Sequence, residues 1–153
     1  MKAPFGSVTG NTTCPSPWAP VTNRAPYGVT TGLSPEQMYR YDIASGQGAQ
    51  SGESPYWGDY AMGSSFQIHP DGTTIYTSSG DVFLSAASPR SDMTYLGKLG
   101  QNWDDLAFST DGTMAYALRS KSSQLAIYHT ATLSQLHTYA MSAPAERILR
   151  GDG

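Results

Sequence analysis

The stretch FQIHPDGTTIY, residues 66–76, returns in the same chain as LAFSTDGTMAY, residues 106–116. Every position is shifted by 40, from 66 to 106 at one end and from 76 to 116 at the other. Self-similarity at a fixed spacing is the signature of repeat architectures, so these two copies decide the fold. The positions that carry the match are Phe66/Leu106, Ile68/Phe108, Asp71/Asp111, Gly72/Gly112 and Tyr76/Tyr116.

Each copy predicts a β-hairpin. Apolar and polar side chains alternate on both sides of an Asp-Gly pair, which is typical of strands that bury one face. The Asp-Gly pair predicts the turn between the two strands, because glycine adopts positive φ at little cost. We expect Ile68 and Phe108 to face the interior, and Tyr76 and Tyr116 to pack on the returning strands.

A second element repeats along with the hairpin. Each copy is a short strand that runs into a small polar turn, and another apolar stretch follows it. Four short strands in about forty residues predict an all-β fold of β-propeller blades, each with four antiparallel strands. The second element occupies residues 39–45, 82–88 and 126–132, and the apolar stretches expected as last strands are Tyr60–Met62, Tyr95–Gly97 and Tyr139–Met141.

The repeats predict the organisation of the chain. Residues 1–26 are rich in Pro, Gly, Asn and Thr and predict an irregular N-terminal arm. Residues 27–153 predict a partial first blade, two full blades and the start of a further blade. In this scheme residues 27–31 form the third strand of the partial blade, and residues 147–153 begin a new hairpin. About three blades are fewer than the four to eight that usually close a propeller.

An incomplete ring leaves apolar strand edges open, which natural sheets avoid. We therefore expect the sequence to be a fragment of a longer chain. Self-assembly of copies, or a partner that covers the edges, is the alternative way to complete the ring.

The pattern apolar-x-apolar-x-Pro-Asp-Gly-x-x-x-Tyr in residues 66–76 resembles the YVTN-type and WD40-like β-propeller repeats. The resemblance covers residues 27–153 and implies a propeller fold. It also implies an extracytoplasmic bacterial protein, periplasmic or at the cell surface, with a binding or unassigned function. The sequence departs from WD40 repeats because Trp103-Asp104 precedes a hairpin, and from YVTN repeats because no Asn follows Tyr76-Thr77.

Composition and charge exclude two classes of partner. The 153 residues fit one domain, and 14% are charged, compared with roughly 25% in an average soluble domain. The formal net charge is -3, so the positive field that gathers nucleic acid is missing. Apolar runs extend over a few residues only, so the sequence predicts no membrane span.

Aromatic residues between the blades are the first candidates for ligand binding. Trp57, Tyr60 and Trp103 fall between the last strand of one blade and the next hairpin, where connections approach the face of a ring. Exposed aromatic side chains at such a place stack on a sugar or anchor a peptide. The alternative is that these side chains fill the gap between blades.

Asp104 and Asp105 form the one adjacent carboxylate pair in the sequence. Neighbouring residues in an extended chain point to opposite faces, so we do not expect the pair to act together as general acid and base. A cation site at a channel mouth is the remaining role for these carboxylates.

The sequence predicts a non-enzymatic scaffold that binds a protein or carbohydrate through loops at the ring face. Its three histidines lack metal-ligand spacing, and no phosphate loop, nucleophile elbow or zinc-protease motif appears. We therefore expect no catalytic residue, metal or cofactor. A fragment of a propeller enzyme, such as a lactonase-like hydrolase or a quinoprotein-like oxidoreductase with its site in the central channel, is the alternative.

Overall fold

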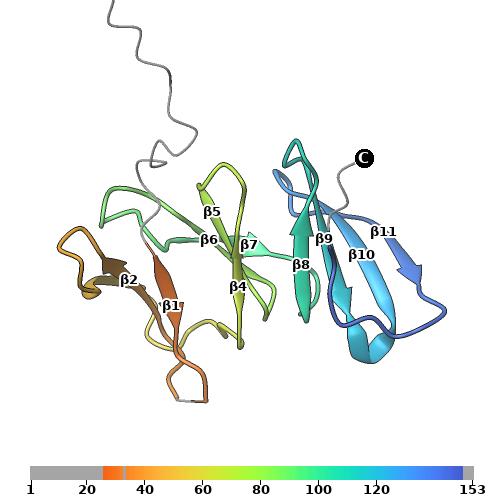
Figure 1. Ribbon diagram of the computed structural model, residues 1–153, viewed down its shortest axis with the longest axis horizontal. Helices are drawn as coiled ribbons and strands as arrows, with labels where there is room; N and C mark the ends of the chain where they lie inside the picture. The colour runs from red at the N-terminus through yellow and green to blue at the C-terminus, as the bar shows by residue number, and fades with distance from the viewer. Residues whose placement is uncertain (1–25, 33, 150–153) are drawn as a thin grey trace, which may run out of the picture.

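A computed structural model describes residues 26–32 and 34–149, and these residues form three antiparallel sheets (Figure 1). The predicted all-β fold, with small antiparallel sheets of up to four strands, is confirmed. Within the described part of the chain, no helix is long and apolar enough to cross a membrane. The first sheet contains β1 (Tyr27–Val29), β2 (Met38–Asp42) and β3 (Ala49–Glu53), in that order.

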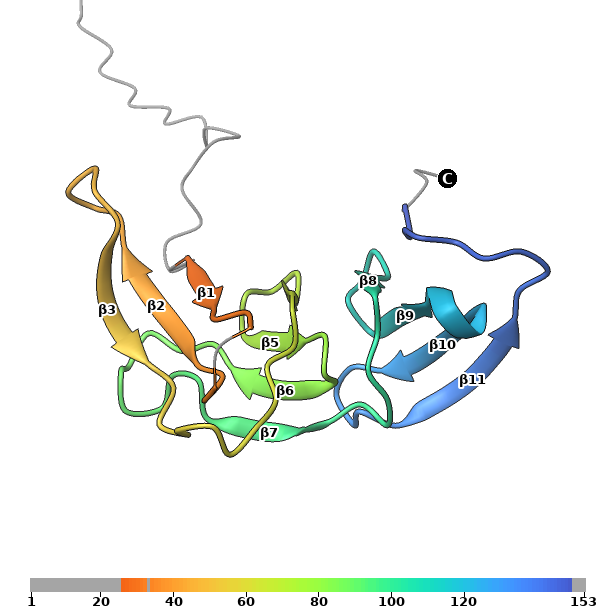
Figure 2. The ribbon, with the colours of Figure 1, turned by 90° about the horizontal axis from the view of Figure 1, so that it is seen from below.

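The second and third sheets each have four strands in chain order. The second sheet contains β4 (Phe66–Ile68), β5 (Thr74–Thr77), β6 (Asp81–Leu84) and β7 (Tyr95–Lys98). The third contains β8 (Asp105–Phe108), β9 (Met114–Arg119), β10 (Gln124–His129) and β11 (Gln135–Ala140), with a 3-10 turn, η1 (Ser120–Ser122), between β9 and β10. Figure 2 shows the three sheets following one another in an arc, which does not close into a ring among these residues.

The two copies of the hairpin have the same backbone pairing. Gln67 pairs with Tyr76 in the second sheet, and Ala107 pairs with Tyr116 in the third. Both turns place their glycine at positive φ, 80° at Gly72 and 73° at Gly112. The sequence prediction of two equivalent hairpins is therefore confirmed.

Consecutive hairpin turns also contact each other. His69 Nε2 in the first turn lies 2.8 Å from the carbonyl oxygen of Gly112 in the second, to which it donates a hydrogen bond. A Cβ atom built on Gly112 would lie 2.9 Å from the His69 ring, so glycine is needed there for close approach as well as for its φ. The two turns therefore fix the spacing of the second and third sheets at this end.

The core lies between the sheets. Ile75 and Tyr76 are neighbours on β5 and point to opposite faces, as strand geometry requires. Ile75 belongs to a cluster with Met38 of the first sheet, whereas Tyr76 belongs to a cluster with Leu106 and Tyr128 of the third. Each sheet therefore covers an apolar face of the next, and the middle sheet is buried on both sides.

The last strand of the first sheet is not the one predicted. Residues 49–53 pair with β2, while Tyr60–Met62 forms no strand. Ala49–Glu53 is a largely exposed edge strand of small and polar residues, so it lacks the apolar signal that the prediction required. Met62 is instead fully buried, and its backbone N–H donates to Glu36 Oε2 at 2.5 Å.

The two ends of the predicted repeat region also differ from expectation. Tyr27–Val29 pairs with β2, which corresponds to the third strand of the later sheets, so β1 takes the second position and not the third. Residues 147–149 form no strand, and residues 150–153 lie outside the described part of the chain. The arm predicted for residues 1–26 also lies outside it, apart from residue 26.

The burial of Tyr76 predicts loss of stability at alkaline pH. Burial raises the pKa of this phenol from 10.0 to about 12, with a smaller contribution from the charge of Asp71. Between these two pH values the unfolded chain has released the proton while the folded chain retains it, so stability decreases as pH rises. We expect Tyr76→Phe, which cannot ionise, to lose less stability in this interval, by up to about 1.4 kcal/mol per pH unit.

Urea unfolding of both proteins at about pH 9.5 and about pH 11.5 measures this difference. Tyr27, whose pKa burial also raises to about 12, contributes equally to both proteins. Equal losses of unfolding free energy in the wild type and Tyr76→Phe would contradict the prediction.

Candidate functional site

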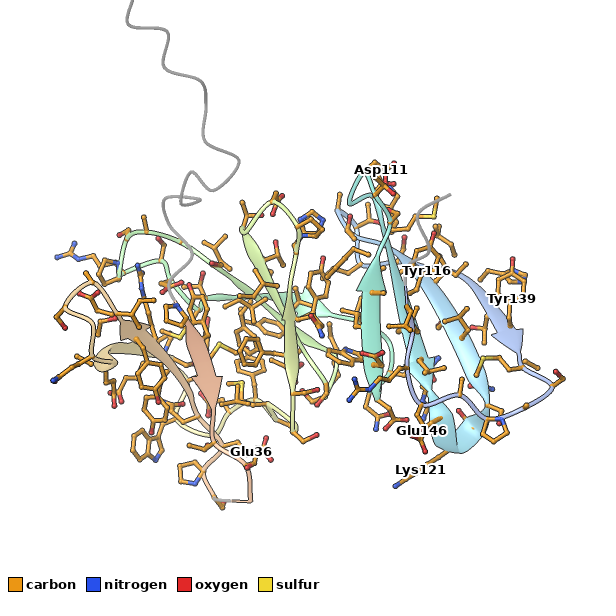
Figure 3. The ribbon with its side chains drawn as sticks, viewed as in Figure 1. Glu36, Asp111, Tyr116, Lys121, Tyr139 and Glu146 are labelled. Carbon is orange, nitrogen blue, oxygen red and sulfur yellow. The ribbon has the colours of Figure 1, made fainter. Side chains whose placement is uncertain are left out.

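A polar pocket lies at the end of the third sheet, between the connection from β7 to β8 and the turn from β9 to β10. Its volume is about 180 Å³. Figure 3 places Lys121 at this lower end of the molecule and Asp111, in a hairpin turn, at the opposite end. The pocket is lined by Asn102, Trp103, Asp104, Arg119, Lys121 and Ser122.

Backbone hydrogen bonds hold the connection that forms one wall of this pocket. Leu99 N donates to Gly80 O at 2.8 Å, and Trp103 N donates to Ser78 O at 3.0 Å. Gly80 has φ of 92°, and a Cβ atom there would lie 2.6 Å from the carbonyl oxygen of Gln101. The turn between β5 and β6 therefore supports the pocket from the second sheet, and it requires glycine for this close approach.

Trp103 packs in the core and lines the pocket. The residue is 4% exposed and belongs to the cluster between the second and third sheets. Its Nε1 atom is buried and has no hydrogen-bond partner among the described residues. A buried N–H donor without an acceptor is costly, and this one belongs to a residue that lines the pocket.

Asp104 connects the two walls. Its Oδ2 atom accepts hydrogen bonds from the backbone N–H of Ser120 at 2.8 Å and from the Ser120 hydroxyl at 2.7 Å. The bond from the hydroxyl, together with the backbone bond and the charges of Lys121 and Arg119, holds the pKa of Asp104 below its ordinary value. The carboxylate is therefore ionised at neutral pH and fixes the 3-10 turn at its first residue.

The two cationic residues of the pocket come from the third sheet. Arg119 ends β9, and its guanidinium donates to Gln101 Oε1 and, at 3.3 Å, to Asn102 Oδ1. A guanidinium has five N–H donors, so these two bonds leave others for a ligand. Lys121 is exposed in the 3-10 turn. Together with Asp104, the pocket has a formal charge of about one positive unit at neutral pH.

Asp105 lies apart from Asp104. Its Oδ2 atom accepts a hydrogen bond from Ile148 N at 2.7 Å, whereas Asp104 contacts Ser120. The two carboxylates thus contact different segments, as the alternation of strand side chains requires. Among the described residues, no group of three or more His, Cys, Asp and Glu side chains is placed to hold a metal ion.

The other two predicted aromatic residues do not line this pocket. Trp57 is 67% exposed in the connection before β4. Tyr60 is half-buried and stacks on Tyr95, with ring centroids 4.2 Å apart. The structure thus brings Trp103 and Asp104 together and leaves Trp57, Tyr60 and Asp105 elsewhere. Ligand binding by these five residues remains a prediction.

Sequence reasoning missed the basic half of the pocket, Arg119 and Lys121. One signal was available, because Arg119 stands where the preceding copy of the repeat has Ser79, 40 residues earlier. The lysine follows two residues later in the turn, where the repeat no longer aligns.

Comparisons with known proteins support the fold and assign no family. No protein-family model matches the sequence, and no curated protein matches it. Among solved structures, the chain is similar to a protein from Lactobacillus plantarum, with a TM-score of 0.51 and 15% sequence identity over 77% of this chain. The match spans 39% of the length of that protein. At this identity the likeness concerns the fold alone.

Proposed function

We propose that this chain is a non-enzymatic scaffold of propeller-type repeats that binds a protein or carbohydrate ligand through the loops around Trp103 and Arg119. The observation that carries the proposal is the polar pocket, whose two walls belong to connections held in place by the second and third sheets. Binding and catalytic residues are often on loops that a rigid scaffold positions. A periplasmic or cell-surface location remains an expectation from the resemblance to YVTN-type repeats.

The chemistry of the pocket favours binding over catalysis. A nucleophile would need an adjacent general base, and the pocket contains no histidine or cysteine. The Oδ2 atom of its carboxylate, Asp104, accepts two hydrogen bonds from Ser120. The lining residues of this pocket therefore offer fixed donors and charges that position a ligand. We propose no cofactor and no catalytic residue.

Two screens followed by nuclear magnetic resonance test this proposal. The full chain is screened against a glycan array and a phage-displayed library of random peptides, and the best binder is titrated into isotope-labelled protein. We expect shifts in the amide signals of residues 99–104 and 119–123, with none in the hairpin turn at 109–113. Shifts confined to that turn, or chemical turnover of the bound compound, would overturn the proposal.

A further inference from the structure

We infer that the pocket between Asn102 and Ser122 recognises a carboxylate group on its ligand. This inference rests on the proposed function and names the chemistry that the site selects. Three features of the lining residues support it: an excess of positive charge, an excess of hydrogen-bond donors, and a carboxylate that uses one oxygen, Oδ2, to hold the neighbouring turn.

Positive charge predominates in the pocket. Arg119 and Lys121 are both cationic at neutral pH, and the one acidic lining residue is Asp104. Opposite charges a few ångströms apart near a protein surface attract with an energy that is useful but sensitive to salt. An anionic ligand therefore gains from this site, while a cation would meet two like charges.

Unused donors also outnumber acceptors at the walls. The Trp103 indole N–H has no partner among the described residues, and Arg119 has N–H groups beyond its two bonds. The Asn102 side chain also carries two amide N–H donors, which its hydrogen bond from Arg119 does not use. A carboxylate accepts only, at two oxygens, and guanidinium groups bind it in bidentate geometry.

Asp104 stabilises the turn that forms one wall of the pocket. Both hydrogen bonds from Ser120 go to Oδ2, so this carboxylate secures the turn that carries Lys121. Its negative charge weakens the attraction for an anion. Asp104→Asn retains an oxygen acceptor for Ser120 and removes that charge, so we expect it to bind carboxylates about twofold to fivefold more tightly. If the ligand instead bound Asp104 through a cation, Asp104→Asn would lose ligand binding.

Small probes measure the selectivity directly. Galacturonate and glutarate carry carboxylates, whereas galactose is the neutral counterpart of galacturonate. We expect roughly millimolar binding of both anions, seen as shifts of the Trp103 indole N–H signal and of the amides of residues 119–122, and no shifts with galactose. Binding should weaken as sodium chloride screens the charges. Trp18→Phe and Trp57→Phe together assign the Trp103 indole signal, because the chain has three tryptophans.

Two charge variants locate the binding groups. Lys121→Gln, at an exposed position, should weaken galacturonate binding about twofold to fivefold. Arg119→Gln, which loses charge-assisted hydrogen bonds, should weaken it about tenfold to a hundredfold. Arg90→Gln, at an exposed position outside the pocket, is the matched control and should bind as the wild type does.

Longer probes separate the sources of the carboxylate. An oligogalacturonate that binds more tightly than an oligoglutamate peptide indicates an acidic carbohydrate, and the reverse order indicates an acidic protein segment. Galactose that binds at the same amides would overturn the carboxylate inference and leave the proposed binding function intact. Absence of shifts with both anions, or loss of carboxylate binding in Asp104→Asn, would also overturn the inference. Chemical turnover of a compound in the screens would instead overturn the proposed function.

Discussion

Asp92→Ala is expected to lower the free energy of unfolding by about 3–5 kcal/mol. The Asp92 side chain is 1% exposed in the connection between β6 and β7. It accepts hydrogen bonds from Tyr27 Oη at 2.8 Å and Ala86 N at 2.9 Å, and it pairs with Arg40 Nη1 at 3.1 Å.

The expected cost is high because Asp92 joins two sheets. Tyr27 and Arg40 belong to the first sheet, and Asp92 belongs to the second. Its removal leaves a guanidinium that is 19% exposed without its carboxylate. It also removes the acceptor of the half-buried Ala86 N–H and one of the two hydrogen-bond partners of the Tyr27 hydroxyl, which keeps Ser85 Oγ. Uncompensated buried charges and donors are among the few causes of losses this large.

Urea unfolding, followed by far-ultraviolet circular dichroism, measures the effect. Asp92→Asn retains one oxygen acceptor and should cost less than Asp92→Ala. Asp59→Asn, at an exposed position, is the matched control and should change stability by no more than about 0.5 kcal/mol. An Asp92→Ala protein as stable as Asp59→Asn would refute the assigned role.

Phe83→Ala is expected to cost about 3–5 kcal/mol through a cavity between the first and second sheets. Phe83 is fully buried and meets Tyr60 edge to face, with ring centroids 5.7 Å apart. Tyr95, at 5.8 Å, completes an aromatic group around it. Truncation removes the ring that these neighbours enclose, and aromatic pairs contribute beyond the area that they bury.

Thermal and urea unfolding measure this loss, with two comparison variants. Phe83→Leu fills part of the cavity and should lie between the wild type and Phe83→Ala. Leu96→Ala, on the adjacent strand at a residue that is 51% exposed, should cost no more than about 0.5 kcal/mol. Equal costs at positions 83 and 96 would show that the aromatic group is not a packed core.

The hairpins could be predicted because their determinants are local. Asp71-Gly72 and Asp111-Gly112 each fix a turn, and the alternating residues around them fix which side of the strand is buried. Because the same pattern occurs in two copies, the prediction of each hairpin was better supported than a single Asp-Gly motif would allow. Strand positions 66–68, 74–77, 105–108 and 114–119 follow directly from this pattern.

The outer strand of the first sheet could not be predicted in this way. Residues 49–53 form it through backbone hydrogen bonds to β2 while exposing nearly all their side chains, so no apolar pattern is needed. Tyr60–Met62 has the apolar pattern but uses it differently. Tyr60 stacks on Tyr95 and Met62 is fully buried, without strand pairing. Apolar residues indicate that a segment is buried, and irregular segments are buried as well as strands.

The candidate site was only half visible from sequence for a similar reason. The sequence indicates Trp103 because it falls between a last strand and the next hairpin, and Asp104 because it belongs to a carboxylate pair; both line the pocket. Arg119 is the last residue of β9 and Lys121 follows it in the 3-10 turn, and the pairing of β8 with β9 brings them to the end of the sheet where Trp103 lies. The folded sheet brings these side chains together, and their spacing along the chain does not predict that they share one pocket.

The contact between His69 and Gly112 bears on how such chains change length during evolution. The first hairpin turn supports the second, so removal of part of either repeat would separate the histidine from the glycine that receives it. A duplication or loss of about forty residues moves a complete set of strands together. Growth by whole units, with variation in the connections near Trp103 and Lys121, is therefore the route that leaves neighbouring sheets undisturbed.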